Sequence, residues 1–298
     1  PSLYANITKH KTLAADGSVQ SVTIANLNRR MAVLIWFLWP AIMLAIHDPS
    51  RVRRLLAYAS ISFGAATILL YGSHQSSQVA LLGGLVAFGI ASWFNRTAVI
   101  GALAALWSAA VLLVVPISLM TLNADLHKAN WLFYSAQHRV VIWGTAAEEV
   151  MRAPIIGIGA DATRSAMKKA VSEAKAAEQA RDFGKFDSGY ANHAHNVYLQ
   201  VWYELGAVGA LLLLAVGLFV LRAIATLQAG VQPTAIAMFV TTSLLIGFSY
   251  SIWQTWFIAA CGLSVAIFAV AIRKRSDQLG LTGEPIPSTA DKMAAKTV

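Results

Sequence analysis

The stretch TAVIGALAALWSAAVLLVVPISLMTL, residues 97–122, contains no charged side chain. An α-helix rises about 1.5 Å per residue, so about 20 apolar residues span the hydrocarbon core of a membrane. A helix also satisfies its backbone hydrogen bonds within itself, which lipid requires because it offers no partners. The stretch therefore predicts a transmembrane helix.

Other apolar runs lie on both sides of this one, and together they predict about seven transmembrane helices. Hydrophobic residues make up 57% of the 298 residues and charged residues only 12%, whereas a soluble domain carries about 25% charged residues. The mean hydropathy is +0.59. The predicted fold class is an all-α, polytopic transmembrane bundle. The other runs cover approximately 31–47, 55–72, 79–94, 197–221, 234–250 and 254–272.

Basic residues in the short connections predict the orientation of this bundle, because lysine and arginine concentrate on the cytoplasmic side. The connections on the opposite side, 73–78 and 251–253, contain neither residue, although Arg29 and Arg30 precede the first helix there. The formal net charge of +9 therefore reflects helix ends and one loop rather than a nucleic-acid surface. The residues on the predicted cytoplasmic side are Arg51, Arg53, Arg54, Arg96, Arg222, Arg273, Lys274 and Arg275.

The long connection 123–196 is expected to face the periplasm. Loops longer than about 15 residues are usually functional or disordered, and this one shows helical patterns over 138–152, ending before Pro154, and over 161–182. The predicted organisation is a periplasmic segment 1–30, helices one to four over 31–122, the large periplasmic loop 123–196, helices five to seven over 197–272, and a disordered cytoplasmic tail 273–298.

Five histidines fall on the predicted periplasmic side. Simple solvation would account for histidines in a loop, and His193-Ala194-His195 could alternatively hold a metal ion. No HExxH motif and no obvious carboxylate accompany this pair, so we expect no metal site. The five residues are His74, His127, His138, His193 and His195.

The most specific feature is His195-Asn196, nine residues before Gly206-Ala207-Val208-Gly209. This segment resembles the signature of the O-antigen ligase and polysaccharide polymerase superfamily. The upstream stretch is similar to the same family in an arginine, a tryptophan four residues later and a P-x-x-G-x-G segment, which are Arg139, Trp143 and residues 154–159.

Two positions depart from the family pattern. The twin threonines that some ligases carry after G-x-x-G are Ala210-Leu211 here, and 73–78 lacks the arginine that many members carry. One expected phosphate contact is therefore missing from that connection. Family members also have more helices than seven, and the sequence starts at Pro1. We therefore expect this chain to be the C-terminal portion of a longer protein.

The resemblance implies a metal-independent, cofactor-free membrane glycosyltransferase. It would move a glycan, with inversion, from a polyprenyl-pyrophosphate carrier to an acceptor hydroxyl at the periplasmic face. Arginine binds phosphate through two parallel N–H groups, and the family position gives this role to Arg139. His195 matches the family histidine and would take the proton of the hydroxyl. Asn196, Trp143 and His74 are expected to contact substrate.

Glu204 lies in the first turns of the predicted fifth helix. Ionisable groups in a membrane span usually have a partner or a role, and the sequence does not identify which applies here.

Within the resemblance, O-antigen ligation to lipid A-core in the bacterial inner membrane is the favoured reaction, with membrane lipid as a further partner. A polymerase extending a growing glycan and a protein O-oligosaccharyltransferase use the same chemistry with other acceptors. A membrane transporter or a non-catalytic scaffold is the alternative from another class. A transporter should show inverted repeats and ionisable residues at the midplane, whereas the apolar runs carry almost no charges.

Overall fold

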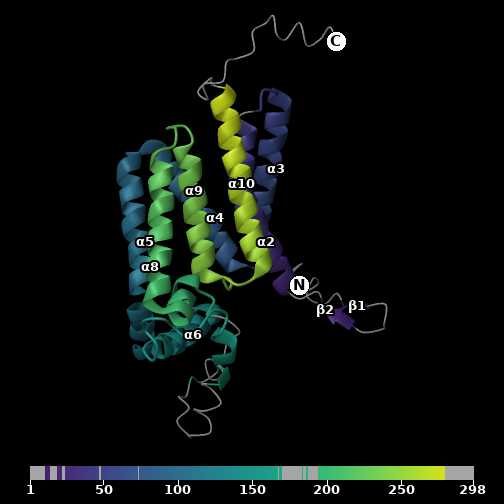
Figure 1. Cartoon of the computed structure of the whole chain (residues 1–298). Helices are drawn as coiled ribbons and strands as arrows, with labels where there is room; N and C mark the ends of the chain where they lie inside the picture. Colours follow the sequence, from purple (N-terminus) through teal and green to yellow (C-terminus); the bar gives the residue numbers. More distant parts are fainter. Residues whose placement is uncertain are drawn as a thin grey trace, which may run out of the picture.

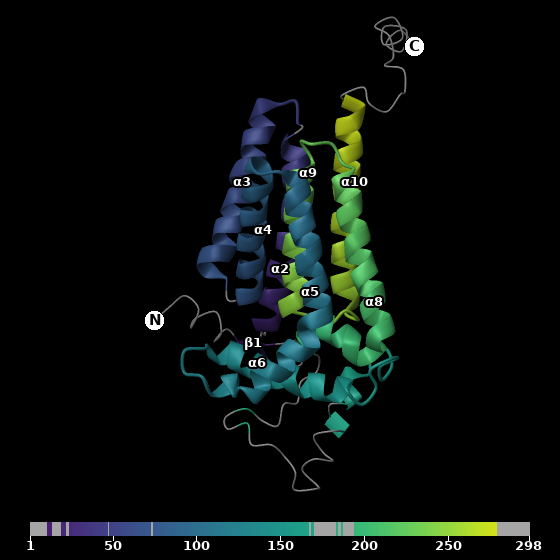
Figure 2. The ribbon, with the colours of Figure 1, turned by 90° about the vertical axis from the view of Figure 1, so that its left-hand side faces the viewer.

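The protein is a bundle of long antiparallel helices with a shorter helix lying across one end (Figures 1 and 2). In this computed structural model, helices make up nearly all of the regular structure. The residues that the structure describes are 11–13, 19–21, 24–46, 48–72, 74–166, 168–169, 183, 186 and 194–278.

Each of the seven predicted apolar runs corresponds to one helix of this described part, and the runs 55–72, 79–94 and 234–250 extend one or two residues past the end of their helix. Six of these helices are long and apolar enough to cross a membrane, and α9, with 17 residues, is shorter. The prediction of an all-α, polytopic bundle is therefore confirmed, and the chain is a multi-pass membrane protein. The seven are α2 (Ile24–Ile46), α3 (Arg51–Tyr71), α4 (Gln75–Trp93), α5 (Arg96–Asn123), α8 (Val197–Ala225), α9 (Gln232–Phe248) and α10 (Thr255–Gln278).

Helix α6 (Tyr134–Val150) and the short 3-10 helix η1 (Leu126–Lys128) cover one end of the bundle. We call this end the loop end. Helix α6 begins before the predicted residue 138 and ends before Pro154, whose ring cannot continue a helix. The second helix predicted in the loop is helical at 163–166, and most of 167–182 lies outside the described residues.

The structure departs from the predicted boundaries at both ends. A short antiparallel hairpin of β1 (Lys11–Leu13) and β2 (Val19–Ser21) precedes α2, and α2 itself begins within the predicted segment 1–30. At the other end, the disordered tail was predicted to begin at 273, but 273–278 are the last turns of α10. Arginine and lysine favour helix and reach water from a helix end, so a helix continues past its apolar run. Residues 279–298 lie outside the described part.

Two apolar clusters form most of the core, and we call the first of them the bundle core. The bundle core joins α2, α4, α9 and α10, with Trp36, Trp39, Leu81 and Ile236 fully buried. The second cluster joins α5, α6 and α8 and lies nearer the loop end. Helix α3 packs mainly on α2, and most of its side chains are exposed, as expected for a helix whose outer face meets lipid.

Candidate transfer site at the loop end

The site begins at the carboxyl end of α9, where the last carbonyls of a helix have no partner within the helix. Arg139 of α6 donates from Nη2 to the Phe248 oxygen at 3.2 Å and to Ser76 Oγ at 3.4 Å. Ser76 in turn donates to the same Phe248 oxygen at 2.9 Å. The carboxyl end of a helix carries partial negative charge, so it stabilises the guanidinium there.

His195 uses the next carbonyl of the chain. Its Nδ1 lies 3.0 Å from the Ser249 oxygen, and a carbonyl oxygen can only accept. In the neutral ring, the proton is therefore on Nδ1 and the lone pair on Nε2. The His195 backbone is left-handed, with φ of 53°. The structure thus brings the two residues predicted to be catalytic, 56 positions apart in sequence, onto consecutive carbonyls of one helix end.

Asn196 is the N-cap of α8. Its Oδ1 accepts from the Leu199 amide at 3.1 Å, which satisfies one of the donors left open at a helix start. The side chain is buried at 5% exposure. This cap fixes where α8 begins and hence where His195 lies immediately before it. A substrate contact by Asn196 stays a prediction.

Trp143 holds the backbone on the other side of His195. Its Nε1 donates to the Ala194 oxygen at 2.8 Å, and its ring lies 6.1 Å from that of Phe248. Trp143 therefore links α6, the segment before α8 and the end of α9. Its predicted contact with substrate also stays a prediction.

His74, the residue before α4, lies close to the same group. Its Nδ1 is 2.6 Å from Ser77 Oγ, and its ring is 5.5 Å from that of Tyr250. Burial, and then the positive charge of Arg139, lower the pKa of His74 to about 4. The ring is therefore neutral at physiological pH. Burial also lowers the pKa of Arg139, but an arginine keeps its charge in proteins.

The other histidines singled out in the sequence have different surroundings. The His127 ring is buried 5.9 Å from the Phe183 ring, and the His138 ring stacks on Phe186 at 5.4 Å. His193 lies outside the described residues. Within the part of the chain that the structure describes, no group of three His, Cys, Asp or Glu side chains could hold a metal ion.

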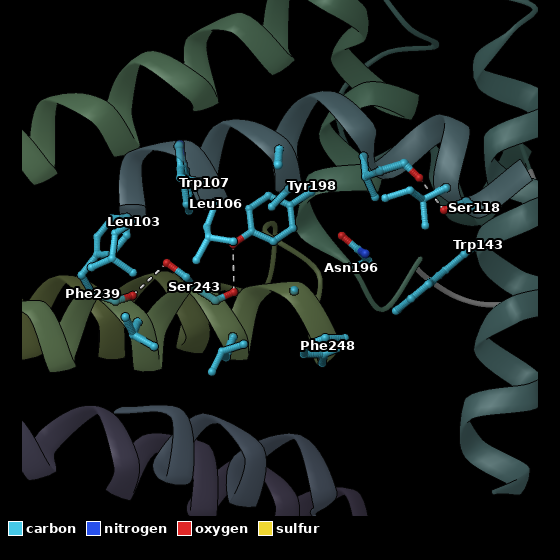
Figure 3. A pocket seen from close by; sticks show the side chains of 17 residues that line it. Leu103, Leu106, Trp107, Ser118, Trp143, Asn196, Tyr198, Phe239, Ser243 and Phe248 are labelled. Atoms are coloured by element: carbon cyan, nitrogen blue, oxygen red, sulfur yellow. Dashed lines mark hydrogen bonds between the residues drawn. The ribbon is translucent and has the colours of Figure 1, made fainter. Parts of the chain in front are cut away.

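A cavity of about 410 Å³ extends from this group into the bundle, between α5, α8 and α9. Trp143, Asn196 and Phe248 line one end (Figure 3). The carbonyl of Phe248 is the one that accepts from Arg139. Farther in, the walls are almost wholly apolar. They include Leu103, Leu106, Trp107, Ala110, Phe239 and Leu244.

The two glycine motifs of the sequence, residues 154–159 and 206–209, contact each other. Helix α8 is broken at Gly206, whose φ of 61° and ψ of −156° are open essentially only to glycine. The segment 154–159 fills the break with backbone hydrogen bonds. These are Ile158 N to Tyr203 O at 3.1 Å, Gly159 N to Glu204 O at 2.9 Å, Ala207 N to Pro154 O at 2.8 Å and Val208 N to Ile155 O at 3.2 Å.

Gly206 and Gly157, one from each motif, have no room for a side chain. A Cβ on Gly206 would lie 2.3 Å from the Ile155 oxygen, and one on Gly157 would lie 2.3 Å from the Glu204 carbonyl carbon. The two motifs therefore form one interlocked junction, which fixes the upstream loop against the helix that begins after His195.

The sequence around Glu204 does not reveal a partner for this residue. The structure buries its carboxylate and surrounds it with donors from Thr163, Gln200 and Trp253. Phe248 and Ser249 were missed altogether. They contribute backbone carbonyls, and no side-chain pattern marks such groups in a sequence.

Fold and site together define a class of protein, a multi-pass membrane protein with a polar site under a helical loop at one end of its bundle. The profile of a family described as "O-Antigen ligase" matches residues 59–214, just over half of the chain. The chain belongs to this family.

Individual relatives agree with the family. A Rickettsia conorii protein described as "Putative polysaccharide ligase" is 29% identical over 127 residues, which cover 42% of this chain and 29% of the relative. A Rickettsia bellii protein of the same description is 25% identical over 240 residues, covering 78% of this chain and 55% of the relative. The chain thus spans about half, or less, of the length of these curated relatives. No solved structure matches significantly.

Proposed function

We propose that this chain carries the transfer site of a glycosyltransferase resembling O-antigen ligases. It would move a glycan from a polyprenyl-pyrophosphate carrier to an acceptor hydroxyl, with inversion and without a metal or cofactor. The observation that carries the proposal is the placement of Arg139 and His195 on the consecutive carbonyls of Phe248 and Ser249. A cation and an imidazole held on adjacent carbonyls are what this reaction requires.

The donor would bind with its pyrophosphate at Arg139. The guanidinium uses Nη2 for two protein acceptors and has other N–H groups to offer an anion. The apolar cavity opens beside it, so the first isoprene units of the carrier fit between α5, α8 and α9. Trp143 and Asn196 at its mouth would contact the sugar, and neutral His74 would border the phosphate.

His195 would act as the general base. The acceptor oxygen attacks the anomeric carbon, its proton passes to Nε2, and the bond from that carbon to the pyrophosphate oxygen breaks. The pyrophosphate leaves with the electron pair, and attack opposite to it inverts the anomeric centre. Pyrophosphate is already a good leaving group, so its charge needs a fixed cation rather than a metal ion.

We infer that the loop end faces the periplasm of a bacterial inner membrane, with 1–30 and 123–196 on that side and 273–298 in the cytoplasm. The basic starts of α3 and α5 and the basic end of α10 lie at the opposite end, as the distribution of positive charge favours. A Cys261→Ala protein with one new cysteine tests this. An impermeant thiol reagent should label Ser165→Cys and not Ser276→Cys in intact spheroplasts, and the reverse pattern would refute it.

The acceptor proposed is lipid A-core, which makes the chain part of an O-antigen ligase. The descriptions of the Rickettsia proteins support ligation over polymerisation. Transfer to a growing glycan or to a protein would use the same residues, so assays of the purified full-length protein with each acceptor separate these reactions. Metal independence is checked in the same assay, in which EDTA should leave the rate unchanged.

The decisive experiment is His195→Ala in the full-length protein. General base catalysis typically contributes about 10²–10⁴-fold, so glycan transfer should fall by that factor while the protein stays folded in the membrane. His193→Ala, two residues away and outside the family motif, is the control and should keep most activity. Near-normal transfer by His195→Ala would refute the base, and equal losses from both variants would indicate a shared structural or metal role.

A further inference from the structure

We propose that Glu204 is a positioning residue for His195, acting through the connection between α9 and α10. The inference rests on the proposed role of His195 as the base. It comes from a buried carboxylate that the proposed mechanism leaves unused.

The Glu204 carboxylate is only 1% exposed and is held by donors from three parts of the chain. Oε1 accepts from Thr163 N at 3.2 Å, from Thr163 Oγ1 at 2.5 Å and from Gln200 Nε2 at 3.1 Å. Oε2 accepts from Trp253 Nε1. A carboxylate is the side chain best suited to this position, because both of its oxygens only accept.

Two of these partners fix the connection 249–254. Trp253 belongs to it, and Gln200 reaches it twice more, by donating to Ser251 Oγ at 2.9 Å and accepting from Ile252 N at 3.3 Å. Gln200 and Glu204 are one turn apart on α8, so together they tie the connection to that helix. The connection is therefore held along its length rather than at its ends alone.

The first residue of the same connection supplies the carbonyl that orients the base. Ser249 O accepts from His195 Nδ1 at 3.0 Å, and this bond places the lone pair on Nε2. If the connection shifts, the imidazole loses both its orientation and its preference for this tautomer. Glu204 thus influences the proton acceptor without touching it. Its hydrogen bonds to Gln200 and Trp253 hold the connection, and the connection holds the Ser249 carbonyl that orients His195.

Glu204→Gln is the informative substitution because it preserves shape and burial. Its amide places two donors where an oxygen accepted, so it faces either the Trp253 indole or the Thr163 and Gln200 donors. The hydrogen bonds to one of the two carboxylate oxygens must then break. Glu149→Gln is the matched control, since it makes the same change in a carboxylate that pairs with the exposed Arg152 side chain.

The test is a double-mutant cycle in the full-length enzyme reconstituted in liposomes, with a polyprenyl-pyrophosphate-linked glycan as donor. Glu204→Gln should lower kcat about 10–100-fold and leave the KM for the donor within twofold, while Glu149→Gln keeps activity. In a His195→Ala background, Glu204→Gln should lower the remaining rate less than twofold, because no base is left to orient.

Each outcome decides a different question. An equal loss from Glu204→Gln in both backgrounds, or a raised KM with unchanged kcat, would overturn the positioning role and leave the base intact. Near-normal transfer by His195→Ala alone would overturn the base, and the positioning role with it. If Glu204→Gln does not fold, Trp253→Phe removes only the indole donor and should show the same dependence on His195 with a smaller loss.

Discussion

The bundle core and the loop end are held together by different forces. In the bundle core, large apolar side chains such as Trp36, Leu81 and Leu245 are fully buried, and the side-chain hydrogen bond from Trp39 to Thr241 is one of few. At the loop end, Arg139, His195 and Glu204 are each fixed by hydrogen bonds to other segments. Shape therefore specifies the scaffold, whereas directed polar contacts specify the site.

The largest effect expected from this difference is at Arg139. Arg139→Ala should reduce transfer at least about 10³-fold, because the pyrophosphate would lose its cation and the end of α9 a donor. Arg139→Lys should restore little, since lysine lacks the planar fork. Arg152→Ala is the control, an exposed residue paired with Glu149 and expected to be close to neutral. Full rescue by lysine would show that only charge matters.

The second-largest effect is expected on stability, from a change in backbone geometry at the loop end. Gly206→Ala should destabilise the protein by roughly 3 kcal/mol, because alanine is strained at this φ and ψ and its Cβ would collide with Ile155. Gly101→Ala, in α5 with open space around it, should be neutral or slightly stabilising. Thermal unfolding in detergent measures both. Equal melting temperatures for the two variants would contradict the interlocked junction.

Filling the cavity tests whether its apolar walls bind the lipid part of the donor. Ala110→Phe places a ring in the cavity and should raise the KM for the lipid-linked donor about tenfold, a loss on the scale of one displaced apolar group. Ala105→Phe, on the exposed side of the same helix, is the control. An unchanged KM for Ala110→Phe would place the carrier elsewhere.

The smallest effect is expected for a polar contact inside the bundle core. Thr241→Val removes the acceptor of the Trp39 indole, which lies at 2.8 Å. Such contacts between membrane helices contribute about 0.6 kcal/mol on average, so the melting temperature should fall by only a few degrees with full activity. Thr67→Val on exposed α3 should show no change. A loss as large as that of Gly206→Ala would remove the distinction between the two regions.

Sequence analysis predicted the scaffold well because its signal is local. Length and hydropathy were enough to find the seven apolar helices of the described part, and Pro154 marked the end of α6. The family motif identified both Arg139 and His195 as candidate catalytic residues. The capping role of Asn196 was not predicted, although asparagine immediately before an apolar run is a common helix start.

The contacts that assemble the site were beyond the sequence because they are distant or lie in the backbone. Glu204 meets Thr163 and Trp253 from 41 and 49 residues away, and no pattern connects these positions. The carbonyls of Phe248 and Ser249 belong to every residue type. The break at Gly206 was not predicted, because glycine is also common within unbroken membrane helices and the run continues on both sides of it.

That break has a consequence for the depth of the site in the membrane. Unbroken, the 29 residues of α8 would reach about 43 Å, well beyond a hydrocarbon core of roughly 30 Å. The portion after Gly206, 207–225, measures roughly 28 Å and by itself matches this thickness. The first turns of α8 then stand at the level of the lipid headgroups. In the proposed mechanism, a carrier whose tail remains among the acyl chains would thus present its phosphates to Arg139, with its sugar near His195, without leaving the bilayer.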